Sequence, residues 1–368
     1  MTLNREIRVG ILDVTPYPPR TGGEFILHEI AATLSRNFPT VRRRFALNTH
    51  GSVVFYPFFP LCLPYSAGFQ RKVDVLFSPW SGALPCYADM IYLQPPVISA
   101  HDAPGLRGRL GIGDATPRGL WPPPLMWLYY NRLVRGLLDG AALRTLDSVG
   151  TIIVASPQLG DEVKAEFGRD SMVIRPCLER GVFEALCRPR PRAQRKRRVL
   201  TISRIVPAKR LEVMVAIANE LPKVEFVLAG QTGARSEDYI RKLTAANVAG
   251  NLAVRTSIDD LTKTQLLESS SVFLNTSVNE TFGLTLLEAV LAGAYPIAHA
   301  SGGPLEYLPA QHLFRTPEEA VHLIGNAIER ELDVPADLVE RARQIADPDR
   351  FERDIRAATE HAFLARRR

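Results

Sequence analysis

The segment "NETFGLTLLEAVLAG" (279–293) is mostly apolar and has helical spacing, yet it contains two glutamates, Glu280 and Glu288. One interpretation is local: Thr285 and Glu288 form a capping box, in which a hydroxyl and a carboxylate satisfy free amides at a helix start. This explains Glu288 but leaves Glu280 and Gly283 without a role. The segment therefore has to be interpreted together with the strands and loops around it.

The segment lies within a regular alternation of apolar runs that predict strands and helices. In the second half of the chain the predicted strands are RVLTIS (198–203), VEFVLAG (224–230), NLAVRT (251–256), VFLNTS (272–277) and YPIAHA (295–300). In the first half they are IRVGILDV (7–14), VDVLFS (73–78), DMIYLQ (89–94), TIIVAS (151–156) and SMVIRP (171–176). Helices between strands imply parallel sheets, so we predict an α/β fold with two doubly wound halves and a ligand cleft at the strands' carboxyl ends.

Chain length and charge distribution indicate two domains. A chain of 368 residues exceeds one ordinary core. The run "CRPRPRAQRKRR" (187–198) separates the halves, and we expect it to be a solvated linker with no residue in a core. The formal net charge of +6 suits an anionic ligand, a nucleic acid or a membrane surface. No aromatic residues interleave with the basic run, so we predict no nucleic-acid partner.

Cysteine spacing favours a reducing compartment, and the hydropathy of the chain favours a cytoplasmic location. The four cysteines form no CxxC pair and no Cys/His cluster, so no structural zinc is expected. We find no signal-peptide pattern at the N-terminus and no apolar stretch long enough to span a bilayer, and we expect a cytoplasmic location. The segment 119–138 mixes Trp, Tyr and Arg, so a peripheral contact with the cytoplasmic membrane face is an open alternative to a core helix.

The second half also contains residues suited to a nucleoside diphosphate. Arg204 and Lys209 follow the strand at 198–203, where a planar guanidinium and a point charge suit a diphosphate. Gly283 lies near a helix start, where free amides and the helix dipole attract an anion. At about 1.5 Å per residue, Glu288 would lie roughly 7 Å along that helix, within reach of a nucleotide's ribose hydroxyls.

Taken in order, these motifs resemble the donor half of the retaining GT-B glycosyltransferases, specifically glycosyltransferase family 4 (group 1). "SRIVPAK" (203–209) is similar to that family's Arg…Lys loop. "NETFGLTLLEAVLAGAYPIAHASGGPLEYL" (279–308) is similar to its Glu-x7-Glu signature and the segment beyond it. "TGGEFILHEIAATL" (21–34) resembles its first glycine loop and helix, and "TIIVASPQLGDEVKAEFG" (151–168) resembles part of the close of its acceptor domain. The resemblance covers nearly the whole chain.

The resemblance implies a GT-B fold, with two Rossmann-like doubly wound domains facing a cleft. Residues 1–185 would form the N-terminal acceptor-binding domain, and 186–198 the basic linker. Residues 199–345 would form the C-terminal nucleotide-sugar-binding domain. Residues 346–368 would form a helix that returns to the N-terminal domain.

The resemblance also implies a role for each matching residue. Glu280, Arg204 and Lys209 would be catalytic. The two cations would bind the donor diphosphate and stabilise it as a leaving group, while Glu280 holds the transferred sugar and Glu288 the ribose. The residues implied in donor binding are Gly22, Gly23, Arg204, Lys209, Glu280, Thr281, Phe282, Gly283, Leu284 and Glu288. One carboxylate of the opening segment would thus serve the sugar and the other the ribose.

On the acceptor side the sequence departs from the family pattern. Many members have a histidine after a mid-domain strand, and the matching segment "IYLQPPVIS" (91–99) carries Gln94 at that place. Gln94 can donate a hydrogen bond to a sugar hydroxyl but cannot titrate. His101 is the second acceptor-side candidate. Retaining transfer is expected to use the leaving phosphate as base, so the enzymatic interpretation stands.

The resemblance implies that no bound metal is required. Two cations and a helix N-terminus already offset the charge that develops on the leaving diphosphate. A DxD motif, Asp347-Pro348-Asp349, does occur, but it lies between helical patterns near the C-terminus. We interpret it as the turn at a helix start.

Within the family, "NETFG" and "AHASGGP" most resemble the dolichol-linked-oligosaccharide α-1,2-mannosyltransferase branch. This implies a GDP-mannose donor, a glycan or lipid-linked acceptor, and no further cofactor. In "RTSIDD" (255–260), Asp259 or Asp260 could accept hydrogen bonds from guanine, or both could cap the next helix. Two other functions stay open: a UDP-hexose-dependent transferase of the same fold, and a catalytically silent GT-B binding protein.

Overall fold

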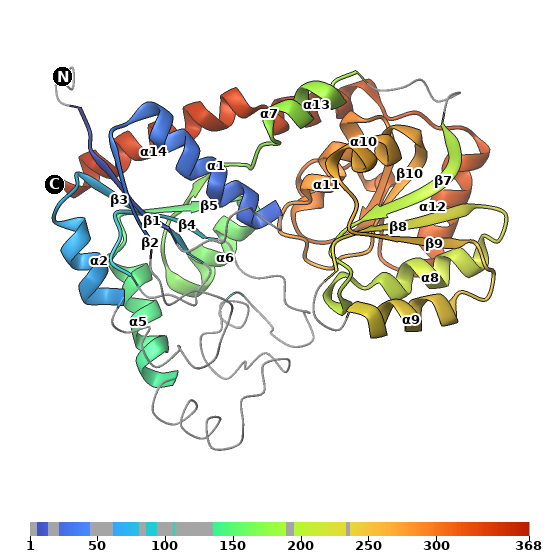
Figure 1. Cartoon of the computed structure of the whole chain (residues 1–368), viewed down its shortest axis with the longest axis horizontal. Coiled ribbons are helices and arrows are strands. Elements are labelled where there is room, and N and C mark those ends of the chain that lie inside the picture. Colours follow the sequence, from blue (N-terminus) through green and yellow to red (C-terminus); the bar gives the residue numbers. More distant parts are fainter. Residues whose placement is uncertain are drawn as a thin grey trace. The chain divides into compact units, whose positions relative to one another are not determined.

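The computed structural model describes residues 6–13, 22–44, 62–80, 86–93, 106, 135–188, 195–232 and 236–367. The chain divides into two compact units (Figure 1). Unit 1 comprises Met1–Arg175 and Asp349–Arg368, and unit 2 comprises Pro176–Pro348. The division after Arg175 comes earlier in the chain than the predicted boundary at residue 185.

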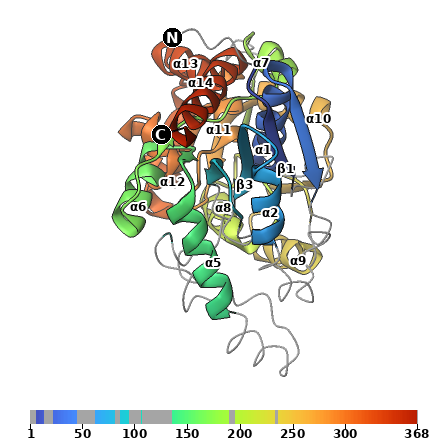
Figure 2. The same ribbon diagram turned by 90° about the vertical axis from the view of Figure 1, so that its left-hand side faces the viewer.

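Unit 1 contains a six-stranded parallel sheet in the order β2-β1-β3-β4-β5-β6. Its strands are β1 (Val9–Asp13), β2 (Thr40–Arg44), β3 (Val75–Trp80), β4 (Met90–Leu93), β5 (Thr151–Val154) and β6 (Met172–Val173). Its helices are α1 (Gly22–Asn37), α2 (Cys62–Gln70), α5 (Arg135–Ser148), α6 (Pro157–Phe167) and α14 (Pro348–Arg366). Helix α2 lies beside β1 and β3 (Figure 2).

Unit 2 contains a second six-stranded parallel sheet, in the order β12-β11-β10-β7-β8-β9. Its strands are β7 (Lys196–Ile202), β8 (Glu225–Gly230), β9 (Leu252–Thr256), β10 (Ser270–Asn275), β11 (Tyr295–His299) and β12 (Leu313–Phe314). Its α-helices are α7 (Arg180–Leu186), α8 (Leu211–Glu220), α9 (Ser236–Ala246), α10 (Asp260–Ser269), α11 (Leu284–Leu291), α12 (Pro317–Glu329) and α13 (Ala336–Ala346). Its short 3-10 helices are η5 (Pro207–Lys209), η6 (Gly303–Glu306) and η7 (Ala310–His312).

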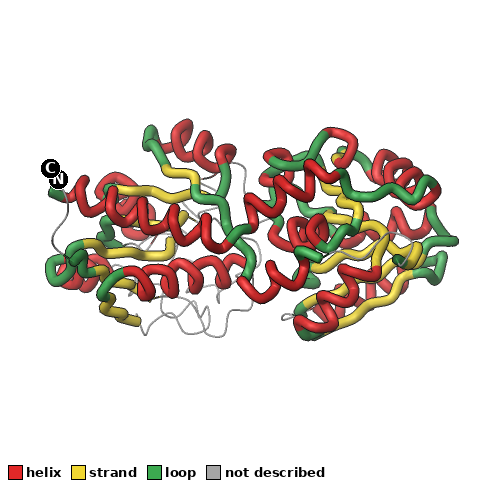
Figure 3. The backbone as a smooth tube through the Cα atoms, turned by 90° about the horizontal axis from the view of Figure 1, so that it is seen from above, coloured by secondary structure: helices red, strands yellow, loops and turns green. Residues whose placement is uncertain are grey.

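Side chains of the second sheet alternate between two apolar layers. Leu200 and Val227 belong to a buried cluster with residues of α10, α11 and α13. Their neighbours Val199 and Phe226 belong to another cluster, with residues of α8 and α12. Since successive strand residues point to opposite faces, both faces of this sheet are covered by helices (Figure 3). The predicted α/β class is confirmed.

The strand order of unit 2 reverses between β7 and β10. From β7 the chain continues to β8 and β9 on one side, and from β10 it continues to β11 and β12 on the other. In open parallel sheets this switch point leaves a crevice at the carboxyl ends of the strands, where ligands bind. A ligand site is therefore expected at the loops after β7 and β10.

The basic run 187–198 is not the fully solvated linker that its composition predicts. Arg195 and Arg198 are 8% and 4% exposed, so the expectation that no residue of 187–198 enters a core is wrong. Arg195 donates to the carbonyls of Leu267, Ser270 and Ala292 at the ends of α10 and α11. A cation is favourable there because the last carbonyls of a helix are free and carry negative partial charge.

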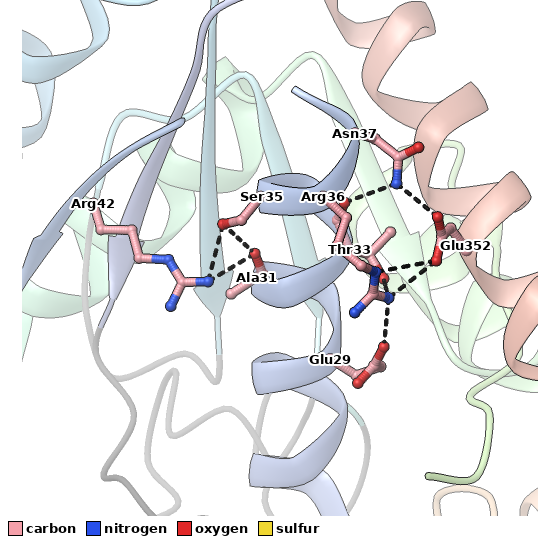
Figure 4. Close-up of polar contacts among 8 residues, drawn as sticks. All are labelled: Glu29, Ala31, Thr33, Ser35, Arg36, Asn37, Arg42 and Glu352. Atoms are coloured by element: carbon pink, nitrogen blue, oxygen red, sulfur yellow. Dashed lines mark hydrogen bonds and ion pairs between the residues drawn. The ribbon is translucent and has the colours of Figure 1, made fainter. Parts of the chain in front are cut away.

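The C-terminal helix α14 packs within unit 1. Glu352 of α14 accepts hydrogen bonds from Arg36 (3.0 Å) and Asn37 (2.9 Å) at the end of α1 (Figure 4). Near its other end, Arg366 forms a 2.9 Å ion pair with Asp89 and donates to carbonyls that include those of Val73 and Gln70. Two separate polar contacts thus attach α14 to the first sheet's unit.

Substituting Arg366 with methionine is expected to lower the free energy of unfolding of unit 1 by about 2 kcal/mol. Asp89 is buried, and once its cation is lost, its remaining donors among the described residues are Gln70 and the Leu76 amide. Breaking a buried pair costs about 3–5 kcal/mol, and the partial exposure of Arg366 reduces that figure. Urea denaturation measures the difference.

Arg356 on the same helix provides the matched control. It pairs with Glu360 at 3.1 Å but is 62% exposed, so Arg356→Met should change stability by less than about 0.5 kcal/mol. Equal effects of the two substitutions would show that Arg366 does not attach the helix.

Within the described residues, we find no helix with the length and apolarity needed to cross a bilayer.

Candidate functional site

The predicted donor residues of unit 2 lie on two loops at the switch point. Arg204 and Lys209 follow β7, on the loop that includes η5. Glu280 lies between the end of β10 and the start of α11. Because β7 and β10 are adjacent in the sheet, the two loops leave it side by side. The hydroxyl of Thr276 donates to the carbonyl of Lys209 at 2.7 Å and joins the loops directly.

Lys209 and Glu280 form an ion pair, with 2.6 Å between Nζ and Oε2. Their side chains are only 11% and 14% exposed, so water screens the pair weakly. Burial disfavours the carboxylate, but the charges of Lys209 and Arg204 and a hydrogen bond from Ser277 outweigh it and lower the pKa of Glu280. Glu280 is therefore ionised at neutral pH, with Arg204 acting from an exposed position.

The backbone around Glu280 is fixed by the segment after β11. The amide of Gly303 donates to the Glu280 carbonyl at 2.7 Å. The amide of Asn279 donates to the Ser301 hydroxyl at 2.8 Å, and that hydroxyl lies 2.8 Å from Nδ1 of His299. Asn279 has φ of 52°, a left-handed conformation that asparagine tolerates better than most residues. These contacts set the position from which the Glu280 side chain reaches Lys209.

Two glycines allow this close approach. A Cβ added to Gly302 would lie 2.3 Å from the Glu280 carbonyl oxygen, and one added to Gly303 would lie 2.5 Å from the Cα of Phe282. Neither position has room for a side chain. The "SGGP" run is therefore more than a turn, because it supports the backbone of the Glu280 loop.

Helix α11 begins at Leu284 without a side-chain cap. Its N-cap is Gly283, which has φ of 89°, and the Tyr307 hydroxyl donates to the Phe282 carbonyl just before it. The capping-box interpretation of Thr285 and Glu288 is wrong, because the Glu288 carboxylate turns to another helix. The amides of Leu286 and Leu287 donate to the Gly283 carbonyl, whereas those of Leu284 and Thr285, the first two of the helix, have no partner one turn back within it and can bind an anion.

Glu288 is buried in the second turn of α11, with 7% of its surface exposed. Its Oε1 accepts a hydrogen bond from Nζ of Lys263 on α10 at 2.9 Å. Its Oε2 is buried and has no hydrogen-bond partner among the residues that the structure describes. A buried polar atom without a partner is uncommon and marks a place where a ligand can donate a hydrogen bond.

The remaining predicted residues are distributed as follows. Gly22 and Gly23 form the first turn of α1 in unit 1. Phe282 is buried against the Tyr307 ring, with the ring centroids 5.7 Å apart, while Thr281 and Leu284 are half-buried. Gln94 and His101 lie outside the described residues. The structure therefore brings together Arg204, Lys209 and the 280–288 segment.

The two aspartates considered for a base pocket lie at the start of α10. Asp259 is the N-cap of that helix, and its side chain accepts from the Thr262 amide at 2.7 Å. Hydrogen bonding from Thr262, first by its side chain and then by its amide, lowers the pKa of Asp259. The side chain of Asp260, the next residue, is 91% exposed. The cap interpretation is confirmed for Asp259, whereas Asp260 does not serve as the N-cap and its carboxylate lies 3.8 Å from the Lys263 ammonium.

Four residues of the site escaped the sequence prediction: Ser277, Lys263, Ser301 and Tyr307. The contact between Lys263 and Glu288 spans 25 residues of sequence, so no local spacing signals it. Ser301 lay within the "AHASGGP" motif, but nothing in the sequence links its hydroxyl to Asn279. Tyr307 stands in "LEYL", which by itself indicates only an apolar contact.

We find no group of three or more His, Cys, Asp or Glu side chains placed to hold a metal ion within the described ranges. Asp347 is the C-cap of α13, and Pro348 and Asp349 open α14. The interpretation of this DxD as a helix-start turn is confirmed. Metal independence itself stays a prediction.

A comparison with protein families matches most of unit 2. The family model described as glycosyl transferases group 1 matches residues 183–345. The phosphatidylinositol N-acetylglucosaminyltransferase gpi3 subunit of Schizosaccharomyces pombe is 29% identical over 126 residues, which is 33% of this chain and 27% of that protein. The chain thus spans about a quarter of the length of this curated relative.

Solved structures resemble nearly the whole chain. Anabaena HepE in complex with UDP and glucose has a TM-score of 0.64 at 17% identity, covering 95% of this chain and 98% of that one. WaaG, a glycosyltransferase involved in lipopolysaccharide biosynthesis, has a TM-score of 0.63 at 15% identity, covering 96% and 98%. At such identities the likeness shows the fold alone. The predicted GT-B fold is confirmed.

Proposed function

We propose that this chain, whose residues 183–345 match a glycosyl transferases group 1 domain within a GT-B fold, transfers a sugar from a nucleoside-diphosphate sugar to an acceptor. One observation carries the proposal: the charged groups arranged around the start of α11. The Lys209–Glu280 pair lies just before the helix, and the unpartnered oxygen of Glu288 lies in its second turn. A cation, free amides and a buried acceptor match the diphosphate and ribose of one ligand.

In this proposal the site stabilises the leaving group. As the bond between the sugar's C1 and the β-phosphate oxygen breaks, negative charge grows on the diphosphate. We propose that Lys209, Arg204 and the first amides of α11 interact with that charge without reorganising. Glu280 is held ionised, so it can accept hydrogen bonds from the sugar hydroxyls.

We propose retention of the anomeric configuration, as the sequence resemblance implies. The acceptor oxygen bonds to C1 on the face that the diphosphate leaves, and the acceptor's proton passes to the leaving phosphate oxygen. No protein base is then required. A glycan or lipid-linked acceptor, a cytoplasmic location and a peripheral contact with the membrane face belong to the same proposal.

The donor nucleotide is the least constrained part of the proposal. Motif similarity favours GDP-mannose, and Asp259 or Asp260 is the candidate acceptor for a guanine base. Both aspartates are exposed, but the Asp259 side chain is engaged in its helix cap, which leaves Asp260 as the candidate for a base contact. HepE was crystallised with UDP, and the S. pombe relative is named as an N-acetylglucosaminyltransferase. These observations favour a UDP-sugar donor, with GDP-mannose as the second candidate.

Sugar transfer is expected to survive chelation. Arg204, Lys209 and the start of α11 supply the positive charge that a metal ion would otherwise provide. Release of UDP or GDP from the matching donor, with and without EDTA, measures this. Activity that EDTA abolishes and magnesium or manganese restores would contradict the proposed chemistry.

A panel of UDP-glucose, UDP-N-acetylglucosamine and GDP-mannose tests the activity itself. The assay follows nucleotide release in the presence of simple alkyl glycoside and lipid-linked acceptors. We expect release from at least one donor, and loss of that release in Glu280→Gln. No release from any donor with any acceptor would favour the silent binding protein.

A further inference from the structure

Lys263 and Glu288 form a largely buried ion pair between α10 and α11. Lys263 has no part in the sequence prediction or in the proposed sugar transfer. Lys263 lies in the first turn of α10, and its backbone amide donates to the carbonyl of Asp259 at 2.9 Å. The N-cap at Asp259 therefore fixes the turn from which Lys263 extends. Its side chain is 20% exposed and reaches Oε1 of Glu288 at 2.9 Å.

Several acidic groups surround the Lys263 ammonium. Burial opposes its charge, but Glu288, Asp260 and Glu179 outweigh that effect and raise the pKa of Lys263. Of these carboxylates, Asp260 lies 3.8 Å away and is 91% exposed, whereas Glu288 is buried. Lys263 is consequently a permanent cation whose closest contact is one oxygen of Glu288.

The pairing leaves the two oxygens of Glu288 unequal. Oε1 is occupied by Lys263, while Oε2 is buried and unpartnered among the described residues. Leaving a buried acceptor unsatisfied costs about 1–3 kcal/mol, and more for a charged group. That cost is recovered when a ligand donates to Oε2, and a ribose diol presents O–H donors of the required kind.

We infer that Lys263 is a positioning residue for the donor: it holds the Glu288 carboxylate so that Oε2 accepts a hydrogen bond from a ribose hydroxyl. This inference rests on the proposed function. Lys263 acts through Glu288 and need not touch the nucleotide. Without the ammonium, the carboxylate loses both the contact that orients it and the positive charge that compensates its burial.

A purely structural pair makes a different prediction. If Lys263 only joined α10 to α11, its loss would weaken binding of every nucleotide to the same degree. If Lys263 orients Glu288, its loss removes the discrimination between UDP and an analogue that lacks one ribose hydroxyl. The ratio of two dissociation constants measured on one preparation is also independent of the fraction of folded protein.

The test titrates UDP, 2′-deoxy-UDP and 3′-deoxy-UDP calorimetrically into the wild type, Lys263→Met and Lys263→Arg. We expect the wild type to bind one deoxy analogue roughly tenfold more weakly than UDP, as a hydrogen bond to a charged group implies. Lys263→Met should reduce that ratio to below about threefold. Lys263→Arg, which keeps a donor cation, should restore most of the ratio.

Two further variants keep the test decisive. Lys263→Met combined with Glu288→Gln removes both charges, so it avoids a lone buried carboxylate if the single variant folds poorly, and we expect it also to lack discrimination. Lys223→Met serves as the matched control, since Lys223 is exposed and precedes β8, at the edge of the sheet opposite the site.

The outcomes separate this inference from the proposed function. Wild-type discrimination that persists in Lys263→Met and in the double variant would overturn the role of Lys263 and leave the donor site intact. Equal binding of UDP and both deoxy analogues by the wild type would show that Glu288 does not accept from ribose. Failure of the wild type to bind UDP, GDP or ADP would reject the nucleotide site altogether.

Discussion

Lys209→Ala is expected to lower the turnover number by about 100- to 1,000-fold, with a smaller rise in the KM for the donor. The reason is that Lys209 meets charge that grows on the diphosphate as its bond to the sugar breaks, so its contribution is largest in the transition state. The substitution also removes the 2.6 Å partner of Glu280, whose side chain is 14% exposed. Initial rates over a range of donor concentrations separate the two parameters.

Arg204→Ala should act in the same direction but less strongly, because Arg204 is exposed and affects Glu280 only through its charge. Lys223→Ala, at the opposite edge of the sheet, is the control and should leave both parameters unchanged. An unaltered turnover number in Lys209→Ala, with only the donor KM raised, would mean that the cation binds the substrate and does not stabilise the leaving group.

Gly302→Ala is expected to lower turnover by about 100-fold. Its φ of 69° is unfavourable for alanine, and the new Cβ would lie 2.3 Å from the Glu280 carbonyl oxygen. The loop that carries Glu280 must move, and a displacement of about 1 Å in a catalytic group can cost 100-fold in rate. The turnover number per folded molecule, with folding checked by circular dichroism, measures the effect.

Gly250→Ala distinguishes the effect of an unfavourable φ from the effect of the steric clash with the Glu280 loop. Gly250 has a similar φ of 67°, but a Cβ there would meet no atom within 4 Å. It should therefore show the cost of a positive φ without a steric clash, as a loss of about 1 kcal/mol in stability with unchanged turnover. Equal turnover numbers for Gly302→Ala and Gly250→Ala would refute the claim that the glycine turn supports the loop that carries Glu280.

The sequence predicted the fold class well because both sheets are made of short apolar runs separated by helical ones. It missed β2, whose residues Thr40–Arg44 include three arginines and no apolar run. Among the described strands β2 lies at the edge of its sheet, where charged side chains are common, and residues 40–43 are half-buried or exposed. Arg195 was also misjudged, because its role depends on the ends of two helices that come much later in the chain.

The sequence predicted those residues of the site that lie close to one another along the chain. Arg204 and Lys209 lie on one loop, and Gly283 lies beside the helix start that its neighbours predict. The capping-box alternative failed because tertiary packing gave Glu288 a partner on another helix. Contacts such as those of Lys263 and Ser301 come from strand order and loop packing, and a single sequence has no periodicity that reports them.

Calorimetric titration of UDP and GDP into the wild type and Glu288→Gln tests the central claim most directly, because it asks whether unit 2 binds a nucleoside diphosphate through the groups described. We predict one UDP site per chain with a dissociation constant on the order of micromolar, weakened about tenfold or more in Glu288→Gln. GDP should bind about tenfold more weakly than UDP. Absence of binding of either nucleotide at millimolar concentration, or equal UDP binding by the wild type and Glu288→Gln, would contradict the account.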